Sequence, residues 1–236
     1  METTHFALML VLGFVSGMRH ALDPDHVAAV STIVAEHRDL WRSSRIGAFW
    51  GVGHTVTLAA AGVIVLAFKL VIPDRLAAGF ELAVGAMLVV LGGQILWRVA
   101  RDRLHIHAHE HGGERHLHLH SHRHGPDHHH AHGGRYERRS LVVGMVHGLA
   151  GSAPLTVLVL SSMQSLAQGL LYLVMFGIGS IAGMVLISTL IGSPFAYTAW
   201  RFERANRVLR VLAGLASLGI GLAIIYEMGF RSGLWS

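Results

Sequence analysis

The chain has 236 residues, of which 52% are hydrophobic and only 14% charged, and its mean hydropathy is +0.49. This composition predicts an integral membrane protein and argues against a water-soluble domain. The formal net charge of +5 comes from arginines that flank apolar segments, not from a continuous basic surface, so nucleic-acid binding is not expected. The chain has no cysteine, which excludes disulfide relays and iron–sulfur clusters.

Six apolar segments are long enough to cross a bilayer, which takes about 20 residues. In the first of them, a polar cluster interrupts the apolar sequence between Met18 and Val27. The N-terminus has no basic region and no small-residue cleavage site, so this segment is interpreted as a retained span and not as a signal peptide. The predicted spans cover roughly 5–35, 46–70, 79–99, 140–163, 167–191 and 207–229.

The polar cluster in the first span, Arg19 to His26, contains two imidazoles, two carboxylates and a guanidinium. An Asp or Arg at the centre of a membrane helix costs roughly 2.5 to 3.5 kcal/mol on insertion scales, so such a cluster indicates a functional site. Its nitrogen and oxygen donors suit divalent transition metals. A purely structural network is the less favoured reading. Arg19 precedes Asp23 by four residues and is expected to neutralise it.

Proline at position 24 predicts a break in this first helix, because it lacks an amide donor and disfavours helix in the preceding residue. On an unbroken helix His20 and His26 would lie about 120° apart and would not chelate one ion. Asp23 and His26, three residues apart, could share one. Unwinding near Pro24 would bring His20 onto the same ion.

The predicted metal ligands are His20, Asp23, Asp25, His26 and, in the next span, His54. Asp25 is expected either to bind the ion or to fix an imidazole tautomer. His54 alone is as compatible with a hydrogen-bonded interhelical histidine as with a ligand. In the second half of the chain His147 is favoured as structural, because its surroundings lack the carboxylates, and it remains a candidate pathway residue with Ser152 and Ser180.

The chain repeats itself weakly at an offset of about 127 residues. Residues 17–22 align with 144–149, residues 50–54 with 176–180, and residues 91–93 with 218–220. Because each half has three spans, the second half enters the membrane in the opposite sense, as in many secondary transporters. The predicted fold is therefore an all-α polytopic membrane protein with about six transmembrane helices, arranged as two inverted three-helix repeats. The predicted units are the first repeat (1–100), a largely disordered loop (101–139) and the second repeat (140–236).

Basic residues predict the orientation of the chain in the membrane. Fifteen of them fall in the segments 36–45, 98–139 and 201–210, whereas the other side receives only Lys69, Arg75 and Arg231. The positive-inside rule therefore predicts a cytoplasmic 98–139 loop and termini outside, in a multi-pass protein of the cell membrane, which in a bacterium is the inner membrane.

The loop between the halves contains thirteen of the nineteen histidines. Histidine-rich low complexity is typical of metal binding, and a merely soluble linker would not need so many imidazoles. We therefore expect auxiliary metal binding by His105, His107, His109, His111, His116, His118, His120, His122, His124, His128, His129, His130 and His132.

The pattern His-x4-Asp-His, formed by His20, Asp25 and His26, resembles the signature of the nickel/cobalt transporter (NiCoT) family, and more closely its short urease-associated nickel permeases. The resemblance extends to residues 53–55 and 147–149, and so to most of the membrane part. It implies that the three signature residues are needed for transport of nickel or cobalt. Longer members have eight spans with the signature in the second, whereas this chain has six predicted spans with the signature in the first.

These observations predict a secondary-type permease for divalent cations, most directly Ni²⁺ or Co²⁺, with no prosthetic group and no enzymatic activity. The alternatives are an efflux protein, a membrane metalloenzyme and a metal-delivery anchor. The zinc-protease pattern His-Glu-x-x-His is missing, which disfavours the enzyme. Expected partners are the metal ion, membrane lipid, and urease or hydrogenase maturation proteins. The sequence ranks neither nickel against cobalt nor import against export.

Overall fold

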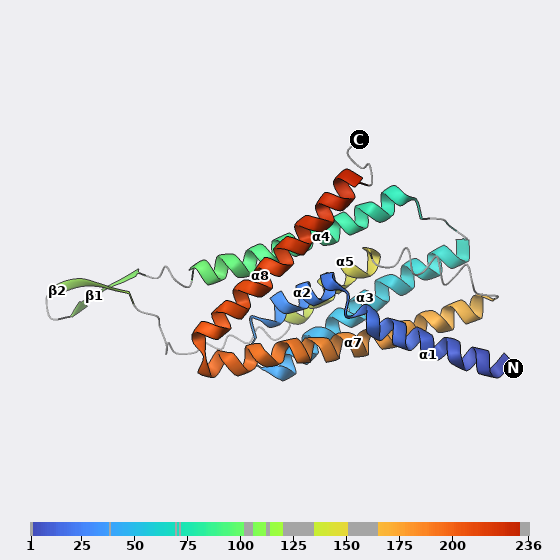
Figure 1. Ribbon diagram of the computed structural model, residues 1–236, viewed down its shortest axis with the longest axis horizontal. Coiled ribbons are helices and arrows are strands. Elements are labelled where there is room, and N and C mark those ends of the chain that lie inside the picture. Colours follow the sequence, from blue (N-terminus) through green and yellow to red (C-terminus); the bar gives the residue numbers. More distant parts are fainter. Residues whose placement is uncertain are drawn as a thin grey trace.

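The computed structural model describes residues 2–37, 39–68, 70, 72–101, 106–111, 114–119, 135–150 and 165–231. These residues form an elongated helical bundle and one small β-hairpin (Figure 1). The elements are α1 (Glu2–His20), α2 (Pro24–Val34), α3 (Leu40–Phe68), α4 (Asp74–Arg101), β1 (Ile106–His111), β2 (Glu114–Leu119), α5 (Arg135–Ala150), α7 (Leu166–Arg201), α8 (Glu203–Tyr226) and a π-helical turn (Glu227–Arg231).

Among the described residues, four helices are long and apolar enough to cross a membrane, over Leu40–Val65, Asp74–Arg101, Ala167–Ala199 and Glu203–Phe230. They correspond to the second, third, fifth and sixth predicted spans. The first predicted span is divided between α1 and α2, and α1 carries a shorter apolar stretch, Ala7–His20. Of the fourth predicted span, the structure describes α5 up to Ala150, and residues 151–163 lie outside the described residues.

The predicted break near Pro24 is confirmed, because α1 ends at His20 and α2 begins at Pro24. Asp23 has φ −58° and ψ 140°, an extended conformation that is favoured before proline. Pro24 occupies the start of α2, where its missing amide proton costs no helical hydrogen bond. Three residues thus separate two helices inside one span.

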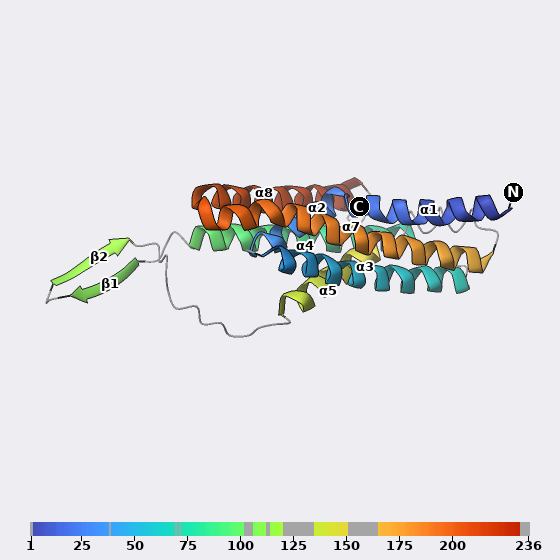
Figure 2. The same ribbon diagram turned by 90° about the horizontal axis from the view of Figure 1, so that it is seen from below.

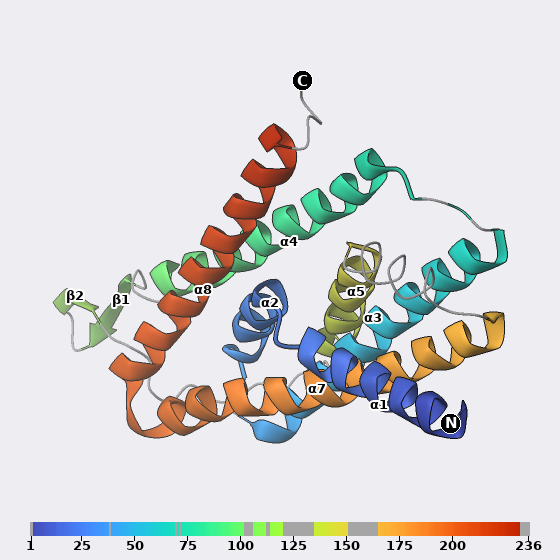
Figure 3. The ribbon, with the colours of Figure 1, turned by 45° about the vertical axis from the view of Figure 1, so that its right-hand side comes forward.

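The helices pack in pairs: α1 lies against α7, α5 against α3, α3 against α7, and α4 against α8. The short helix α2 lies inside the bundle, in contact with α3, α4, α7 and α8 (Figure 3). Its side chains Ala29, Val30, Ile33 and Val34 are almost completely buried. Large apolar side chains on the long helices, such as Val56 and Leu212, are more than half exposed, as expected for surfaces that face lipid.

Ion pairs join several helices at the end of the bundle where α4 finishes and where α3, α5 and α8 start (Figure 2). Glu36, just beyond α2, pairs with Arg98 of α4 and lies 3.9 Å from Arg139 of α5. Arg45 of α3 pairs with Glu137 of α5 at 3.0 Å. The arginines predicted to share one side of the membrane therefore contribute to contacts at one end of the molecule.

Part of the histidine-rich loop forms the hairpin. Strands β1 and β2 pair antiparallel, with His107 opposite His118 and His109 opposite His116. His111 also lies on β1. The remaining eight loop histidines, at positions 105, 120, 122, 124, 128, 129, 130 and 132, lie outside the described residues. The predicted metal binding by this loop stays a prediction.

Candidate metal site

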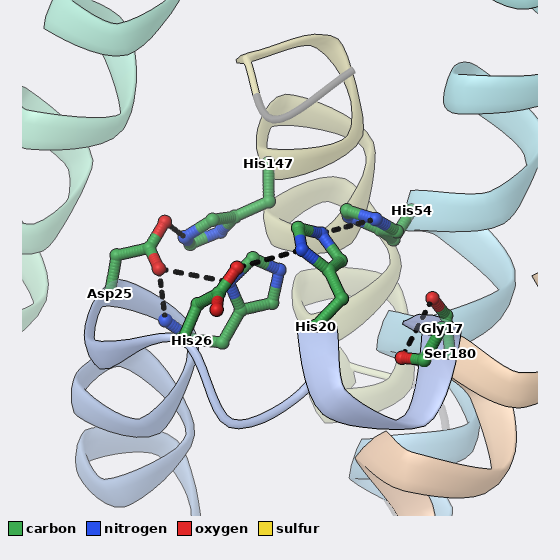
Figure 4. Close-up of polar contacts among 8 residues, drawn as sticks. Gly17, His20, Asp25, His26, His54, His147 and Ser180 are labelled. Carbon is green, nitrogen blue, oxygen red and sulfur yellow. Dashed lines mark hydrogen bonds and ion pairs between the residues drawn. The ribbon is translucent and has the colours of Figure 1, made fainter. Parts of the chain in front are cut away.

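Four imidazoles from four helices converge at the middle of the bundle (Figure 4). His20 ends α1, His26 lies in the first turn of α2, His54 lies half-way along α3, and His147 lies in the last turn of α5. All four side chains are buried, with at most 6% of their surface exposed. The break between α1 and α2 is what allows His20 and His26 to approach, with ring centroids 4.6 Å apart.

His20, His26 and His54 form a first group, in which one nitrogen from each ring lies within 4.8 Å of the others. The Nε2 atoms of His20 and His54 are 3.2 Å apart. Two nitrogens that each bind an ion at about 2.1 Å with an angle near 100° would also be separated by about 3.2 Å. The pair is therefore spaced as two ligands of one metal ion would be.

Two carboxylates lie next to the Nδ1 atoms of this group, on the side of each ring away from Nε2. Asp23 Oδ2 lies 2.7 Å from His20 Nδ1, and Asp25 Oδ1 lies 3.0 Å from His26 Nδ1 and accepts the His26 amide proton at 2.9 Å. A carboxylate that accepts the Nδ1 proton leaves the Nε2 lone pair free for a metal and orients the ring. Asp23 and the Oδ1 atom of Asp25 are therefore placed to orient the imidazoles of His20 and His26.

Asp25, His26 and His147 form a second group with the same 4.8 Å limit. Asp25 Oδ2 lies 3.5 Å from His147 Nε2, which is longer than a good hydrogen bond. His147, favoured as structural from the sequence, therefore lies beside a carboxylate contributed by the first half of the chain.

The donor set fits a divalent cation. The Nε2 atoms of His26 and His147 are buried and have no hydrogen-bond partner among the described residues. Buried polar atoms without partners are unfavourable in a protein interior unless a ligand satisfies them. Imidazole nitrogen with carboxylate oxygen suits nickel, cobalt, zinc and similar ions.

Small residues let the helices approach closely around the site. A Cβ atom on Gly17 of α1 would collide with the Phe176 carbonyl of α7, and one on Gly144 of α5 would collide with the Trp50 carbonyl of α3. Ser180, a predicted pathway residue, donates its hydroxyl proton to the Gly17 carbonyl at 3.3 Å. This hydrogen bond joins α7 to α1 next to the imidazoles (Figure 4).

Trp50 is the site residue that the sequence analysis missed. It is fully buried, and its ring lies parallel to the His26 imidazole, with centroids 5.9 Å apart and an interplanar angle of 6°. The centroid of its ring also lies 5.3 Å from that of the His147 imidazole. The sequence could have indicated this residue, because Trp50 precedes His54 by four positions and residues four apart lie on one face of a helix.

The structure brings together His147, which the sequence favoured as structural, and the five predicted ligands: His20, Asp23, Asp25, His26 and His54. The expected pairing of Arg19 with Asp23 is wrong, because Asp23 pairs with His20 and the Arg19 side chain is exposed. Ser152 lies outside the described residues.

Comparison with known proteins identifies the family. A family model described as high-affinity nickel-transport protein, NicO, matches residues 6–226. The chain belongs to the NicO family. The predicted resemblance to nickel transporters is thereby confirmed. NicO membership, together with the four described helices that are long and apolar enough to cross a membrane, makes the chain a multi-pass membrane transporter of nickel and not an enzyme.

Relatives of this NicO chain differ in length. It is 38% identical to the urease accessory protein UreH of Bacillus sp. (strain TB-90), over 100% of this chain and 98% of the relative. It is 27% identical to the chloroplast protein FOR GROWTH AND FERTILITY 2 of Arabidopsis thaliana, over 94% of this chain and 57% of that protein. No solved structure matches the chain.

Proposed function

We propose that Ni²⁺ crosses the membrane through the buried site in the middle of the bundle, where His20, His26 and His54 bind it. The observation that carries this proposal is the 3.2 Å separation of His20 Nε2 and His54 Nε2, with a carboxylate behind His20 and another behind His26. The permease is of the secondary type, and Co²⁺ is an alternative cargo with the same ligand preference.

Transport proceeds by alternating access of two inverted three-helix repeats. The packing supports this arrangement, since α1 lies against α7 just as α5 lies against α3. The contact of Gly17 with Phe176 and that of Gly144 with Trp50 are related by the sequence offset of about 127 residues.

A second pair of close contacts supports the same repeat. A Cβ atom on Gly179 would meet the Phe14 carbonyl, and one on Gly53 would meet the Leu141 carbonyl. Gly179 corresponds to Gly53 in the repeat, and Phe14 corresponds to Leu141, so each half of the chain makes the same contact with the other half. Reciprocal packing of this kind is expected when two homologous halves face each other around a pseudo-two-fold axis.

The orientation follows from the charges. The end of the bundle that carries Glu36, Arg98, Arg139 and the Arg45–Glu137 pair faces the cytoplasm, and both termini lie outside. In a bacterium the membrane is the inner membrane. The histidine-rich loop would then meet the ion in the cytoplasm and buffer it there.

The cytoplasmic partners are proteins that load nickel into urease or hydrogenase. The support is the name of the Bacillus relative, a urease accessory protein, together with the description of the family as a high-affinity nickel-transport protein. The loop histidines would pass the ion on, because imidazole ligands exchange between neighbouring sites.

Radioactive nickel flux tests the proposal. Purified full-length protein in liposomes is assayed with ⁶³Ni²⁺ in both directions, and externally bound metal is removed with a chelator. His20→Ala and His54→Ala should abolish flux, whereas His37→Gln, which changes a buried histidine outside both groups, should retain it. Flux at the wild-type rate in the His20 and His54 variants would contradict the proposal.

Deletion of residues 105–132 separates transport from buffering. If the membrane site is the pathway, ⁶³Ni²⁺ flux in liposomes survives this deletion. In cells that express the deletion variant, the amount of nickel retained in the cytoplasm should fall. Loss of flux in the deletion together with normal flux in His20→Ala would assign transport to the loop instead.

A further inference from the structure

The buried cluster divides into two groups of ligand atoms that share one residue. His20, His26 and His54 form the first, and Asp25, His26 and His147 form the second. The centroid of the His26 ring is 4.6 Å from that of His20 and 4.6 Å from that of His147. The His26 ring is therefore equally distant from His20 of the first group and His147 of the second.

We propose that Asp25, His26 and His147 form a second nickel position, to which the ion moves from the first position while His26 remains a ligand. The proposal rests on the proposed function, because it assumes that the ion passes through the first group. It adds a distinct step to transport and gives His147 the role of a metal ligand.

The spacing of Asp25 and His147 supports a shared ion. Asp25 Oδ2 and His147 Nε2 are 3.5 Å apart. A nitrogen and an oxygen that bind one metal ion at about 2.1 Å lie about 3.0 Å apart at an angle of 90° and about 3.4 Å apart at a tetrahedral angle, so the observed separation is at the wide end of the range for two ligands of one ion. The same distance is too long for a strong hydrogen bond between them, so a bound cation satisfies this pair better than the two side chains satisfy each other.

His26 can serve both groups because its two nitrogens lie on different edges of the ring. Nδ1 lies 3.0 Å from Asp25 Oδ1, and Nε2 has no hydrogen-bond partner among the described residues. In Figure 4 Asp25 and His147 lie on one side of His26, and His20 and His54 lie on the other. When the ion moves from the first group to the second, the ligand atom of His26 changes from Nε2 to Nδ1, and the proton that Nδ1 donates to Asp25 in the first state is then carried by Nε2.

The two positions differ in charge, which favours movement. The first group contributes only imidazoles, whereas the second contributes the carboxylate of Asp25, a direct counter-charge for a dication. Occupation of both positions at once would place two dications close together in a poorly screened interior. A single ion that alternates between them avoids this repulsion.

The helix connections give the step a direction. His20 ends the helix that comes from the N-terminal side, and Asp25 lies in the first turn of the helix that leads to the arginine-rich end. Movement from the first group to the second therefore follows the chain from α1 to α2. His147 joins at that point from α5, whose other end carries Glu137 and Arg139.

Initial rates of ⁶³Ni²⁺ flux in liposomes, with the full chain, separate the two positions. His147→Gln should lower kcat at least about 10-fold while KM stays within about 3-fold of wild type, because initial binding is intact. His54→Gln should instead raise KM. His37→Gln is the matched control and should leave both constants unchanged, because His37 belongs to neither group.

A ligand exchange distinguishes a metal ligand from a packing residue. His147→Cys should recover part of the lost kcat and should raise the ratio of zinc to nickel flux, since thiolate favours softer ions. A purely structural role would not change metal preference. Detergent-solubilised thermal unfolding of each variant verifies that the protein is folded.

Two results would overturn the second position. A wild-type kcat in His147→Gln would exclude His147 from the pathway, and an increase in KM equal to that of His54→Gln would indicate a single four-histidine site. Wild-type flux in both His20→Ala and His54→Ala would instead refute the proposed function itself, whatever the His147 variants do.

Discussion

Asp23 and His20 meet across the break between α1 and α2, with Asp23 Oδ2 2.7 Å from His20 Nδ1. The imidazole is buried, while about half of the carboxylate side chain is exposed. The carboxylate is therefore placed to orient the buried imidazole of His20 from the edge of the site, and it reaches that imidazole only because the chain turns between the two helices.

Replacement of Asp23 by asparagine tests this orientation. Loss of a carboxylate behind a ligating histidine weakens metal binding by about 10- to 100-fold, so KM for nickel flux should rise within that range. Asp39→Asn is the control, because Asp39 caps the exposed start of α3 through the Trp41 amide. An unchanged KM in Asp23→Asn would show that His20 is oriented by other contacts.

Pro24→Ala tests the break itself. Alanine restores the amide proton and favours a continuous helix, which would move His20 and His26 about 120° apart around the axis. We expect loss of nickel flux with retention of the folded bundle, measured by transport and by gel filtration. Pro73→Ala, just before α4, should transport normally, and normal transport in Pro24→Ala would mean that packing alone maintains the break.

The close helix contacts predict a stability difference among glycines. Gly17→Ala and Gly144→Ala place a methyl group against a backbone carbonyl, and overpacking of this kind costs about 1 to 3 kcal/mol or more. Gly79→Ala and Gly219→Ala meet nothing within 4 Å and should stabilise their helices by up to about 1 kcal/mol. Thermal unfolding in detergent measures both effects, and equal melting temperatures for the two pairs would contradict the packing.

His37 predicts how stability depends on pH. It lies beyond α2, its Nδ1–H donates to the Ile33 carbonyl at 3.0 Å, and its ring meets Tyr136 edge-on at 4.5 Å. Burial lowers the pKa of His37 below its ordinary value of 6.5, despite the opposing effect of Glu36 and Glu137. The nearby Arg42 lowers it further.

Because the native pKa is lowered, the unfolded chain takes up a proton at His37 before the folded chain does as the pH falls. The stabilising contribution of the neutral ring is therefore present above about pH 6.5 and is lost as the pH falls toward the native pKa. The melting temperature should fall more steeply between pH 7 and pH 5 in wild type than in His37→Gln. Parallel pH profiles of the two proteins would contradict this assignment.

Local chemistry explains why part of the site could be predicted from the sequence. The break depends on Pro24 and the residue before it, so it is encoded within a few positions and was predicted correctly. Polar groups are costly in apolar spans, and this cost was the reason to expect that the polar residues of the first two spans share one site. They are His20, Asp25, His26 and His54.

The partners of individual atoms were less predictable. The pairing of Asp23 with His20 in place of Arg19 depends on how the chain turns after α1. The position of His147 beside Asp25 depends on how α5 is rotated against α3, which is set by contacts such as that of Gly144 with Trp50. Helical periodicity places residues on a face, but the packing of one helix on another decides which atoms meet.

The parallel stacking of Trp50 on His26 has an optical consequence. The Trp50 indole is fully buried against the His26 imidazole, so a paramagnetic ion such as Ni²⁺ bound at that imidazole would quench its emission. If nickel binds at the proposed site, Trp50 is a natural fluorophore beside it, and its emission, once separated from that of the other four tryptophans, would report occupancy in real time without an added label.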